Sequence, residues 1–445
     1  MSTAPYDLGV SDFDSFLTTA TALVGEEHVS RDLSAGASEG LDAVRPSTVD
    51  EVRALVRAAN DCHVLFWVVS RGKNLGYGGS APVVDGSVIV DLQRMDKIIE
   101  INEEYAYAIV EPGVTFMQLY DEIQKRKLNL WPSVPAIGWG SVVGNTLERG
   151  IGYTPEGAHY KRQCGMEVVL PDDDLLRTGN GAGEESAMWP LYSGGFGPGL
   201  DGLFFQSNFG IVTKTGIHMS PAPEAYARIV IEVAEETDVV PLLFDRTTLL
   251  ITGMSSVVFP PSYLRADEVT QDFLPQTGVP SIAMSKVYTS STTSGLWHNC
   301  YAPALPPSGR ELYQWYLGAK RITTAHDLNF IADFHVFDRW VIAINLTTFH
   351  PAARGRLESV QKDLMEHSRK EGGYMEYRTH VNFMDETAKG QTFNRGAFVR
   401  FTTKLKDTLD PKGVLSPGKS GIWNAEPSWR AGKKAEADTS NLSER

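Results

Sequence analysis

The sequence predicts an α+β fold in two domains, and three of its features support this. Its 445 residues are long for one domain and comfortable for two, each large enough to bury a core. In the amino-terminal half, short strand-like segments follow one another as hairpins instead of alternating with helices, which argues against a nicotinamide-type Rossmann domain. The composition then changes near residues 221–223, Pro-Ala-Pro. We therefore predict a first domain over 1–220, a smaller second domain over 221–375, and a return to the first domain with a tail over 376–445.

The composition is that of an ordinary globular protein, with 42% apolar and 22% charged residues. The formal charge of −14, from 41 basic and 55 acidic residues, disfavours nucleic acid and anionic membranes as partners. Cys62, Cys164 and Cys300 are widely separated and form no CxxC pair, so neither a metal site nor disulfides are indicated. No signal peptide or bilayer-spanning apolar run is visible. We therefore expect a cytoplasmic protein with a small ligand and no membrane partner.

Helices and strands are expected in the following order. Apolar residues at helical spacing within 1–44 indicate an arm docked on the first domain. Two capping boxes, Thr48 with Glu51 and Thr115 with Gln118, predict the starts of two helices. The expected strands are 64–69, 87–92, 98–102, 105–111, the hairpin of 167–170 with 175–177, and, in the second domain, 229–233 and 341–348, with helices at 308–322 and 354–370.

A glycine-rich stretch, Ser70–Pro82, follows the first buried strand. Its glycines at 72, 76, 78 and 79 let successive N–H groups turn toward one point, a concave shape that suits an anion such as a diphosphate. The spacing matches neither a P-loop nor the GxGxxG turn. A glycine-rich surface turn would explain this stretch alone equally well, so other segments must decide between the two.

Two more glycine-bearing segments follow in the first domain. Residues 135–155 are rich in glycine and serine at places where a backbone can press against a flat ligand. A loop-rich linker is the alternative, but long loops inside compact domains are usually functional. A third glycine-bearing turn leads into a β-rich run at 207–214. The sequence therefore favours a nucleotide-like ligand bound by several separate loops.

Together with the C-terminal Ser-Pro-Gly-Lys-Ser-Gly at 416–421, these segments resemble the vanillyl-alcohol oxidase/p-cresol methylhydroxylase family of FAD enzymes. The resemblance covers most of the amino-terminal domain and the C-terminus. It implies an α+β, two-domain flavoprotein whose smaller cap domain lies over the flavin. The matching pieces are 70–82, 111–115, 144–155 with His159, 165–170, 196–198, 206–214, 376–385 and 410–423.

The resemblance also implies how FAD is held. The diphosphate lies against the first loop, the flavin along the second and the nucleotide end beside the third, while Lys419 faces the flavin pyrimidine. His298, five residues before Pro303, resembles the histidine that bonds covalently to the flavin; Tyr301 is the alternative, because p-cresol methylhydroxylase uses tyrosine. The FAD-binding residues so implied are Ser70, Arg71, Gly72, Lys73, Asn74, Leu75, Gly76, Gly140, Ser141, Gly144, Asn145, Gly210, Ile211, Val212, His298 and Lys419.

For the substrate, the resemblance implies a phenol held by Tyr77, Tyr377 and Arg378. Two hydroxyl donors and a guanidinium that converge on the phenol oxygen would lower its pKa and favour the phenolate. The implied activity is oxidation of para-substituted phenols by hydride transfer to flavin N5 through a p-quinone methide, with O2 reduced to H2O2. A dehydrogenase subunit that passes electrons to a cytochrome is the first alternative, and a flavin-binding protein without turnover is the second. A homodimer is expected.

The sequence departs from the family in two places. Where vanillyl-alcohol oxidase has an aspartate in a Pro-Asp-apolar-Gly pattern, this chain has Ala136 within Pro-Ala-Ile-Gly. An alanine cannot act as a base, which puts water activation near the flavin in question. The stretch between Asn208 and His298 is also shorter than in the family. We therefore expect either a reduced substrate domain or a natural chain that is longer than this sequence.

Overall fold

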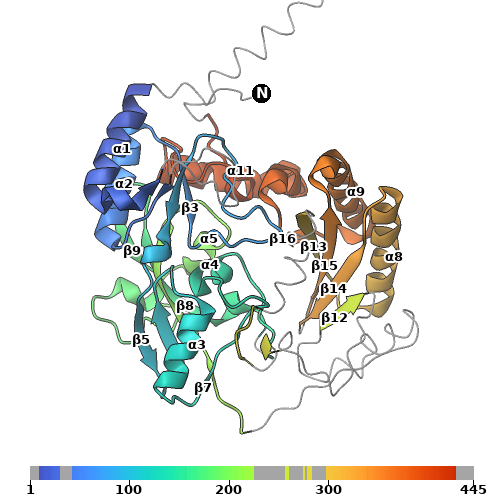
Figure 1. Ribbon diagram of the computed structural model, residues 1–445, viewed down its shortest axis with the longest axis horizontal. Helices are drawn as coiled ribbons and strands as arrows, with labels where there is room; N and C mark the ends of the chain where they lie inside the picture. The colour runs from blue at the N-terminus through green and yellow to red at the C-terminus, as the bar shows by residue number, and fades with distance from the viewer. Residues whose placement is uncertain are drawn as a thin grey trace, which may run out of the picture.

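The computed structural model forms two α+β lobes that lie side by side (Figure 1). The sequence-based expectations for the strand 229–233 and for residues beyond 426 fall outside the described part of the chain. The structure describes residues 10–30, 43–155, 157–224, 256–259, 274–275, 278–282, 297–337 and 339–426.

The strands of the first lobe form two main sheets and a two-stranded ladder. They are β1 (Val29–Ser30), β2 (Ala43–Val44), β3 (Phe66–Val69), β4 (Val88–Asp91), β5 (Ile98–Asn102), β6 (Tyr107–Val110), β7 (Leu130–Trp131), β8 (Gln163–Val169), β9 (Leu175–Arg177), β10 (Ile211–His218) and β11 (Ser220–Pro221). One sheet has the order β1-β2-β4-β3, the other β5-β6-β10-β8-β9, and β7 pairs with β11. The expected hairpins are confirmed in the second sheet, whose neighbouring strands are all antiparallel. In the first sheet, β4 runs parallel to both β2 and β3, which the sequence did not predict.

The helices of the first lobe pack around these sheets. They are α1 (Val10–Val24), α2 (Val49–Cys62), α3 (Phe116–Lys125), α4 (Val142–Leu147), α5 (Asp201–Phe204), α10 (Met384–Ala388) and α11 (Phe393–Leu409). The predicted docked arm is confirmed by α1, because Phe16 is fully buried and meets the ring of Phe66 edge-on at 5.5 Å. Both predicted helix starts are also confirmed, since Thr48 caps α2 and Thr115 forms a reciprocal capping box on α3.

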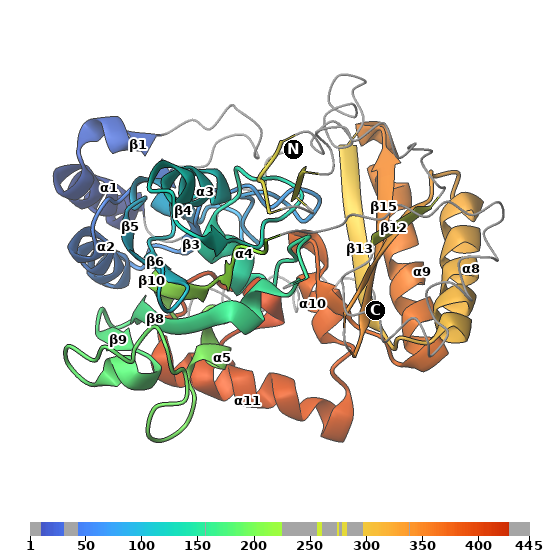
Figure 2. The same cartoon turned by 90° about the horizontal axis from the view of Figure 1, so that it is seen from below.

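The second lobe is one antiparallel sheet with two helices on one face. Its elements are β12 (Ser256–Phe259), β13 (Trp297–Leu305), α8 (Gly309–Ala325), β14 (Ile331–Val336), β15 (Val341–Phe349), α9 (Arg354–Gly372) and β16 (Glu376–Arg378). The strand order is β12-β14-β15-β13-β16. Trp315 and Tyr301 are fully buried where α8 and α9 pack on the sheet. The opposite face of the sheet turns toward the first lobe (Figure 2).

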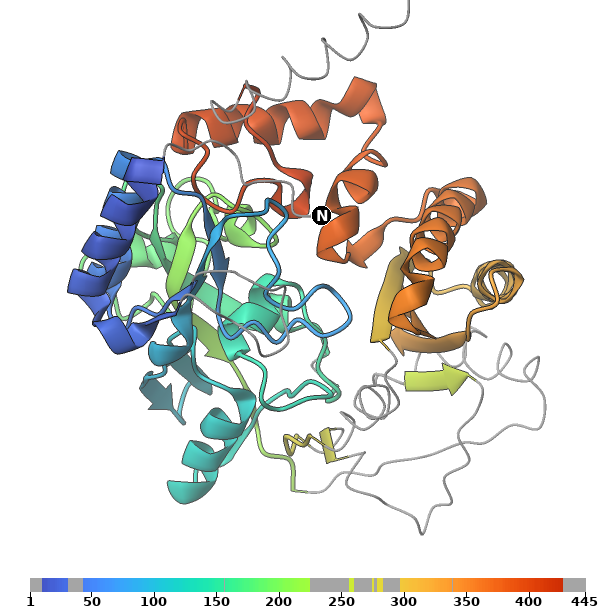
Figure 3. The same ribbon diagram turned by 45° about the horizontal axis from the view of Figure 1, so that its top comes forward.

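The loop after β3 reaches from the first lobe to the second sheet (Figure 3). The carbonyl of Gly76 accepts a hydrogen bond from the Cys300 N–H on β13 at 3.1 Å. The carbonyl of Tyr77 accepts one from the Val381 N–H at 3.2 Å, just after β16. The predicted boundary between 375 and 376 stays a prediction, although β16 pairs with β13 and so the chain leaves the second sheet only after Arg378.

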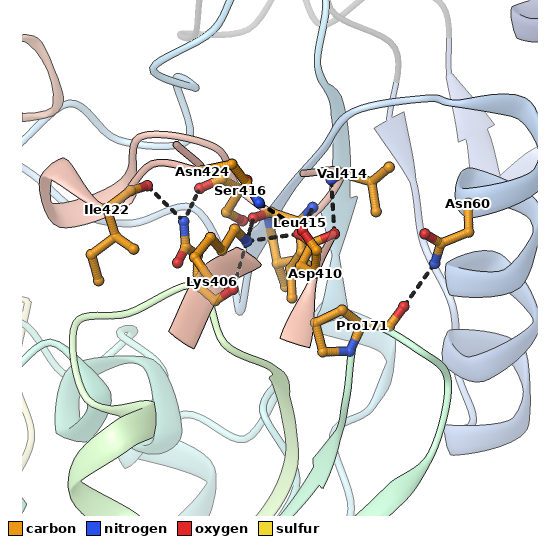
Figure 4. A network of polar contacts seen from close by, with 11 residues as sticks. Asn60, Pro171, Lys406, Asp410, Val414, Leu415, Ser416, Ile422 and Asn424 are labelled. Carbon is orange, nitrogen blue, oxygen red and sulfur yellow. Dashed lines mark hydrogen bonds and ion pairs between the residues drawn. The ribbon is translucent and has the colours of Figure 1, made fainter. Parts of the chain in front are cut away.

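The C-terminal segment returns to the first lobe and pairs with β3, the end strand of the four-stranded sheet. Ser416 N–H donates to the Phe66 carbonyl at 2.8 Å, and Phe66 N–H donates to the Val414 carbonyl at 2.8 Å. A fully buried ion pair, Lys406 with Asp410 at 2.7 Å, lies under this segment (Figure 4). The strand before the first glycine-rich loop is therefore held in place by the end of the chain.

Candidate active site

The glycine-rich segments that the sequence singled out all contribute residues to the wall of one cleft. It encloses about 1190 Å³, including space that opens to solvent. Leu75 lines a neighbouring cavity instead, while Gly76 and His298 line neither. The predicted cofactor residues that line the cleft are Ser70, Arg71, Gly72, Lys73, Asn74, Gly140, Ser141, Gly144, Asn145, Gly210, Ile211, Val212 and Lys419.

The second glycine-rich segment is fixed by the cap of α4. Ser141 Oγ accepts the Gly144 N–H at 2.9 Å and donates to the Pro112 carbonyl at 2.5 Å. A Cβ atom on Gly144 would lie 2.8 Å from Ser70 Oγ, so the close approach of the first and second segments requires glycine there. The first loop has the predicted backbone shape, because its glycines at 72, 76, 78 and 79 all have positive φ.

Lys419 lines the cleft and is paired with Glu148. Lys419 Nζ is 2.5 Å from Glu148 Oε1 and 5.6 Å from the ring centroid of Trp67. Burial would raise the pKa of Glu148, but Lys419 and Arg378 together lower it, so the carboxylate stays charged. The sequence reasoning missed Glu148, although it lies inside the segment 144–155.

The polar groups in the cleft fit FAD. Arg71 Nη1 donates to the Gly113 carbonyl at 2.9 Å, whereas its Nε is buried without a hydrogen-bond partner. Asn208, which the sequence reasoning did not select, has a buried Oδ1 without a partner while its Nδ2 bonds two carbonyls. Both residues line the cleft. A buried donor and a buried acceptor left unpaired by the protein suit the diphosphate and hydroxyl or amine groups of a nucleotide.

A second cavity adjoins this cleft between the two lobes. It encloses about 780 Å³ with its opening, and five residues line both spaces. These shared residues are Lys73, Asn74, Gly140, Asn145 and Arg378. A small molecule here would therefore lie against a ligand in the cleft.

Tyr77, Tyr377 and Arg378, the three predicted substrate residues, meet at this second cavity. The guanidinium carbon of Arg378 lies 5.2 Å from the ring centroid of Tyr77 and 5.7 Å from that of Tyr377. The two tyrosines share a side-chain hydrogen bond. Arg378 Nε donates to the Glu148 carbonyl at 3.0 Å, and Gln206 Nε2 donates to the Tyr377 carbonyl at 2.7 Å. The backbone around the trio is thus fixed from the first lobe.

The trio combines neutral hydroxyl groups with a permanent cation. Burial raises the pKa of Tyr77 and of Tyr377 above 10, so both keep their hydrogens at neutral pH. Burial would lower the pKa of Arg378, but Tyr377, Tyr77 and Glu148 raise it on balance. Nη2 of Arg378 is buried and has no hydrogen-bond partner. The arrangement can therefore donate hydrogen bonds to, and balance the charge of, one anionic oxygen.

His298 lies beside the first loop, next to Gly76. A Cβ atom on Gly76 would be 3.3 Å from His298 Cδ2 and 2.7 Å from Cys300 Sγ. Burial lowers the pKa of His298, so its imidazole is kept neutral. The alternative residue, Tyr301, has its hydroxyl 2.8 Å from Ser368 Oγ in the core of the second lobe. Tyr301 therefore reaches neither cavity, and the structure does not support it as an attachment site.

Asn145 is held by a buried histidine. His159 Nδ1 lies 2.6 Å from Asn145 Oδ1, and Nε2 lies 3.1 Å from Ser133 Oγ. Burial and the nearby Arg378 lower the pKa of His159 to about 3. A neutral imidazole therefore fixes the side chain that lines both cavities.

The remaining wall of the second cavity contains Ala136 and His335. His335 is not among the residues that the sequence singled out. It is buried, with 1% of its surface exposed, and Nε2 lies 2.9 Å from Asp333 Oδ2. No motif marked this residue, because only the pairing of strands brings it to the cavity.

Within the described ranges, no cluster of three or more His, Cys, Asp or Glu side chains has the arrangement of a metal site. No helix in the same ranges is both long and apolar enough to cross a bilayer.

The chain matches known families over both lobes. The family described as "FAD binding domain" matches residues 42–179, and "FAD linked oxidases, C-terminal domain" matches 303–420. The flavoprotein subunit of 4-cresol dehydrogenase (hydroxylating) from Pseudomonas putida is 31% identical in an alignment 492 positions long, which covers 92% of this chain and 93% of that protein. The 1'-carboxy-chondrochloren decarboxylase from Chondromyces crocatus is 38% identical over 50% of this chain and 42% of its own length.

Two solved structures are similar over nearly the whole chain. The 4-ethylphenol oxidase from Gulosibacter chungangensis, in complex with isoeugenol, superposes with a TM-score of 0.82 at 28% identity. The p-cresol methylhydroxylase with substrate bound gives 0.81 at 27% identity. Each comparison covers 95% of this chain and 99% of the other.

Proposed function

The chain belongs to the vanillyl-alcohol oxidase/p-cresol methylhydroxylase family of FAD-linked oxidoreductases, and from this premise we propose that it oxidises para-substituted phenols. The observation that carries the proposal is the convergence of Tyr77, Tyr377 and Arg378 on a cavity that adjoins the FAD cleft. The substrates we expect are 4-alkylphenols, eugenol-like phenols and 4-hydroxybenzyl alcohols.

The three side chains would bind the phenol oxygen and hold it as the phenolate. Loss of a hydride from the benzylic carbon leaves a p-quinone methide only when the ring oxygen supplies electrons, so a bound phenolate lowers the barrier. Donors fixed before the reaction stabilise this charge at little reorganisation cost. Bound FAD would accept the hydride. Lys419, Glu148 and Arg378 line the FAD cleft, and Arg378 also lines the second cavity.

We also propose that His298 is the covalent attachment point for FAD. Its position beside the first loop and its neutral imidazole support this, because a nucleophile must carry a free electron pair. Intact mass after denaturation should exceed the apoprotein mass by one FAD. The increase should vanish in His298→Ala and persist in Tyr301→Phe. An unshifted mass in the natural sequence would withdraw the covalent bond but not the cofactor.

Oxygen is the electron acceptor that we propose, with hydrogen peroxide as the second product. A cytochrome acceptor is the alternative, and the similarity to a 4-cresol dehydrogenase subunit supports it, whereas the similarity to a 4-ethylphenol oxidase supports oxygen. Stoichiometric peroxide during turnover of a 4-alkylphenol in air would indicate an oxidase. Slow reoxidation in air, with fast reoxidation by an added cytochrome, would indicate the dehydrogenase.

The proposed phenolate site is tested with Tyr377→Phe, which removes one hydroxyl donor. Anaerobic flavin reduction by 4-ethylphenol should slow by about 100-fold, the usual cost of losing one preorganised donor. Tyr313→Phe is the matched control, because Tyr313 lies on α8 on the far side of the second sheet. An unchanged rate in Tyr377→Phe would contradict the site. If no phenol reduces the flavin of the natural sequence, the chain is instead a flavin-binding protein without turnover, the second alternative.

A further inference from the structure

We propose that His335, held by Asp333, is the proton acceptor that adds water to the oxidised phenol. The inference rests on the proposed function and deepens it, because it predicts which product leaves the cavity. It starts from a buried histidine that lines the second cavity together with Tyr77, Tyr377 and Arg378.

The ring of His335 is fixed from two sides. It lies on β14, and Nε2 is 2.9 Å from Asp333 Oδ2, two residues earlier on the same face of the strand. The ring of Tyr153 meets it edge-on, with 5.3 Å between centroids. Asp333 keeps 20% of its side chain exposed, whereas His335 keeps 1%. The imidazole is therefore held between a buried cavity and a carboxylate that reaches solvent.

The pairing with Asp333 determines which nitrogen can accept a proton. A carboxylate only accepts hydrogen bonds, so in the neutral imidazole Nε2 carries the hydrogen and Nδ1 keeps its electron pair. Nδ1 is buried and has no hydrogen-bond partner. A buried acceptor is unfavourable without a donor, and a water molecule in a polar cavity is the simplest donor. His335 thus lines the cavity in the tautomer that a general base needs, with Nδ1 not engaged by another protein group.

The other polar side chains of the cavity are poorly suited to this task. Arg378 and Lys73 are cations, and Asn145 Oδ1 already bonds His159. Burial raises the pKa of the Cys300 thiol to about 12, so the thiolate is not available. Ala136 has no polar group. Among the described residues that line this cavity, His335 is the side chain that combines a ring nitrogen without a hydrogen-bond partner with a paired carboxylate.

The step is balanced with water as the only co-reactant. The water oxygen bonds to the electrophilic benzylic carbon of the p-quinone methide, and one water proton passes to His335 Nδ1. The electron pair of the exocyclic double bond returns to the ring, which restores the phenolate at Tyr77, Tyr377 and Arg378. The imidazolium, stabilised by Asp333, then gives its proton to the phenolate as the product leaves. The sum is one quinone methide and one water converted to one 4-hydroxybenzyl-type alcohol.

The test measures the product ratio of the holoenzyme with 4-ethylphenol. Without water addition, the quinone methide loses a proton from its methyl group and gives 4-vinylphenol in place of the alcohol. We expect His335→Gln to lower the ratio of alcohol to 4-vinylphenol at least about tenfold, within the range of general-base effects. Asp333→Asn should lower it in the same direction, because the imidazole loses the carboxylate that stabilises its charged form. Flavin reduction is measured in the same variants, because the product ratio reports on water addition only where the benzylic hydride is still transferred.

His326→Gln is the matched control. His326 Nε2 also bonds an aspartate, Asp363 Oδ2, at 2.8 Å, but this pair lies on the exposed side of the second lobe. An unchanged product ratio in His335→Gln overturns the inference, as does a wild type that forms no alcohol. If His335→Gln does not fold, Asp333→Asn decides by the same ratio. A natural enzyme whose flavin no 4-alkylphenol reduces would instead contradict the proposed function.

Discussion

Glu376 is a partly buried glutamate directly before the proposed phenol residues Tyr377 and Arg378. It accepts hydrogen bonds from neutral groups, Thr387 Oγ1 at 2.9 Å and Gln361 Nε2 at 3.3 Å. Burial is the main cause that raises its pKa to about 7. The group is therefore protonated in the folded protein at pH 6, where an unfolded chain would carry a carboxylate.

A pH dependence of stability follows from this raised pKa. Between the ordinary value of 4.5 and about 7, the folded state holds a proton that the unfolded state has lost, so stability falls as pH rises. Glu376→Gln removes the titration and keeps the shape. The free energy of unfolding of the variant, relative to the natural sequence, should rise between pH 4.5 and pH 7.5. The rise should reach at most about 3 kcal/mol, at roughly 1.4 kcal/mol per pKa unit.

Urea unfolding at a series of pH values measures this difference. The comparison must be made between variants, because buried His159 and partly buried His380 change stability in the opposite direction below pH 6.5. Loss of solvent around the two imidazoles lowers their pKa values to about 3 and about 4. A difference that stays constant from pH 4.5 to 7.5 would show that Glu376 titrates normally.

At the scale of residues, the sequence located side chains that lie in motifs and missed those that only the fold assembles. Tyr77 and Arg378 could be selected because they stand in segments with a recognisable pattern. Glu148, Asn208 and His335 could not, because a lone carboxylate, amide or imidazole has no local signal for the cavity it lines. Their positions depend on contacts between segments far apart in the chain.

At the scale of elements, helix α3 supports the second glycine-rich segment. Its capping residue Thr115 forms an isolated antiparallel bridge with Ser141, and the Phe116 N–H donates to the Gly140 carbonyl at 3.3 Å. The Thr115 side chain accepts the N–H of Gln118, whose own side chain bonds back to Thr115. The capped start of α3 therefore also holds the loop at Gly140 and Ser141 that lines the FAD cleft.

We predict that Thr115→Ala lowers the free energy of unfolding by about 1 kcal/mol, the usual cost of a lost cap. Because the cap is shared with the loop at Gly140, the melting temperature gained on adding FAD to apoprotein should also fall. Thr18→Ala is the control, because Thr18 lies on the exposed side of α1 and its hydroxyl bonds the carbonyl of Asp14 one turn earlier. If Thr115→Ala and Thr18→Ala lower the free energy of unfolding and the melting shift with FAD equally, the cap of α3 does not stabilise the cleft.

The elements that the sequence placed correctly are those determined by residues close together in the chain. Both capping boxes, the hairpin of β8 and β9, and helices α8 and α9 lie close to where the sequence places them. The parallel pairing of β2, β3 and β4 was not foreseen, because it depends on long-range contacts. The C-terminal segment that joins this sheet comes from the other end of the chain.

At the scale of the whole molecule, family, cofactor and two-domain architecture followed from the joint pattern of separate segments, and the comparisons confirm them. The domain boundaries, the homodimer and the cytoplasmic location stay predictions. Most of the stretch between Asn208 and His298, which we expected to be short, lies outside the described residues. Its contribution to the second domain is therefore still an expectation from sequence.

The C-terminal segment packs against β3, the strand that precedes the first glycine-rich loop. Lys406 Nζ donates to the carbonyls of Asn208 at 2.9 Å and Leu415 at 2.7 Å, and the Asp410 carboxylate accepts the N–H groups of Val414 and Leu415 (Figure 4). Both charged side chains are fully buried. One ion pair therefore ties α11, the FAD cleft at Asn208 and the C-terminal segment together.

Because the pair is fully desolvated, breaking it should cost far more than breaking a surface pair. Asp410→Asn leaves a buried ammonium without its anion and should lower the free energy of unfolding by about 3–5 kcal/mol. The double variant Lys406→Met/Asp410→Asn removes both charges and should recover part of that loss. Glu366→Gln, which breaks the exposed pairs with Arg369 and Lys370, both at 3.4 Å, should cost less than about 1 kcal/mol. Urea unfolding of the three variants measures these differences. A double variant less stable than Asp410→Asn would show that the hydrogen bonds of Lys406 to the two carbonyls, and not the charge pair, hold the segment in place.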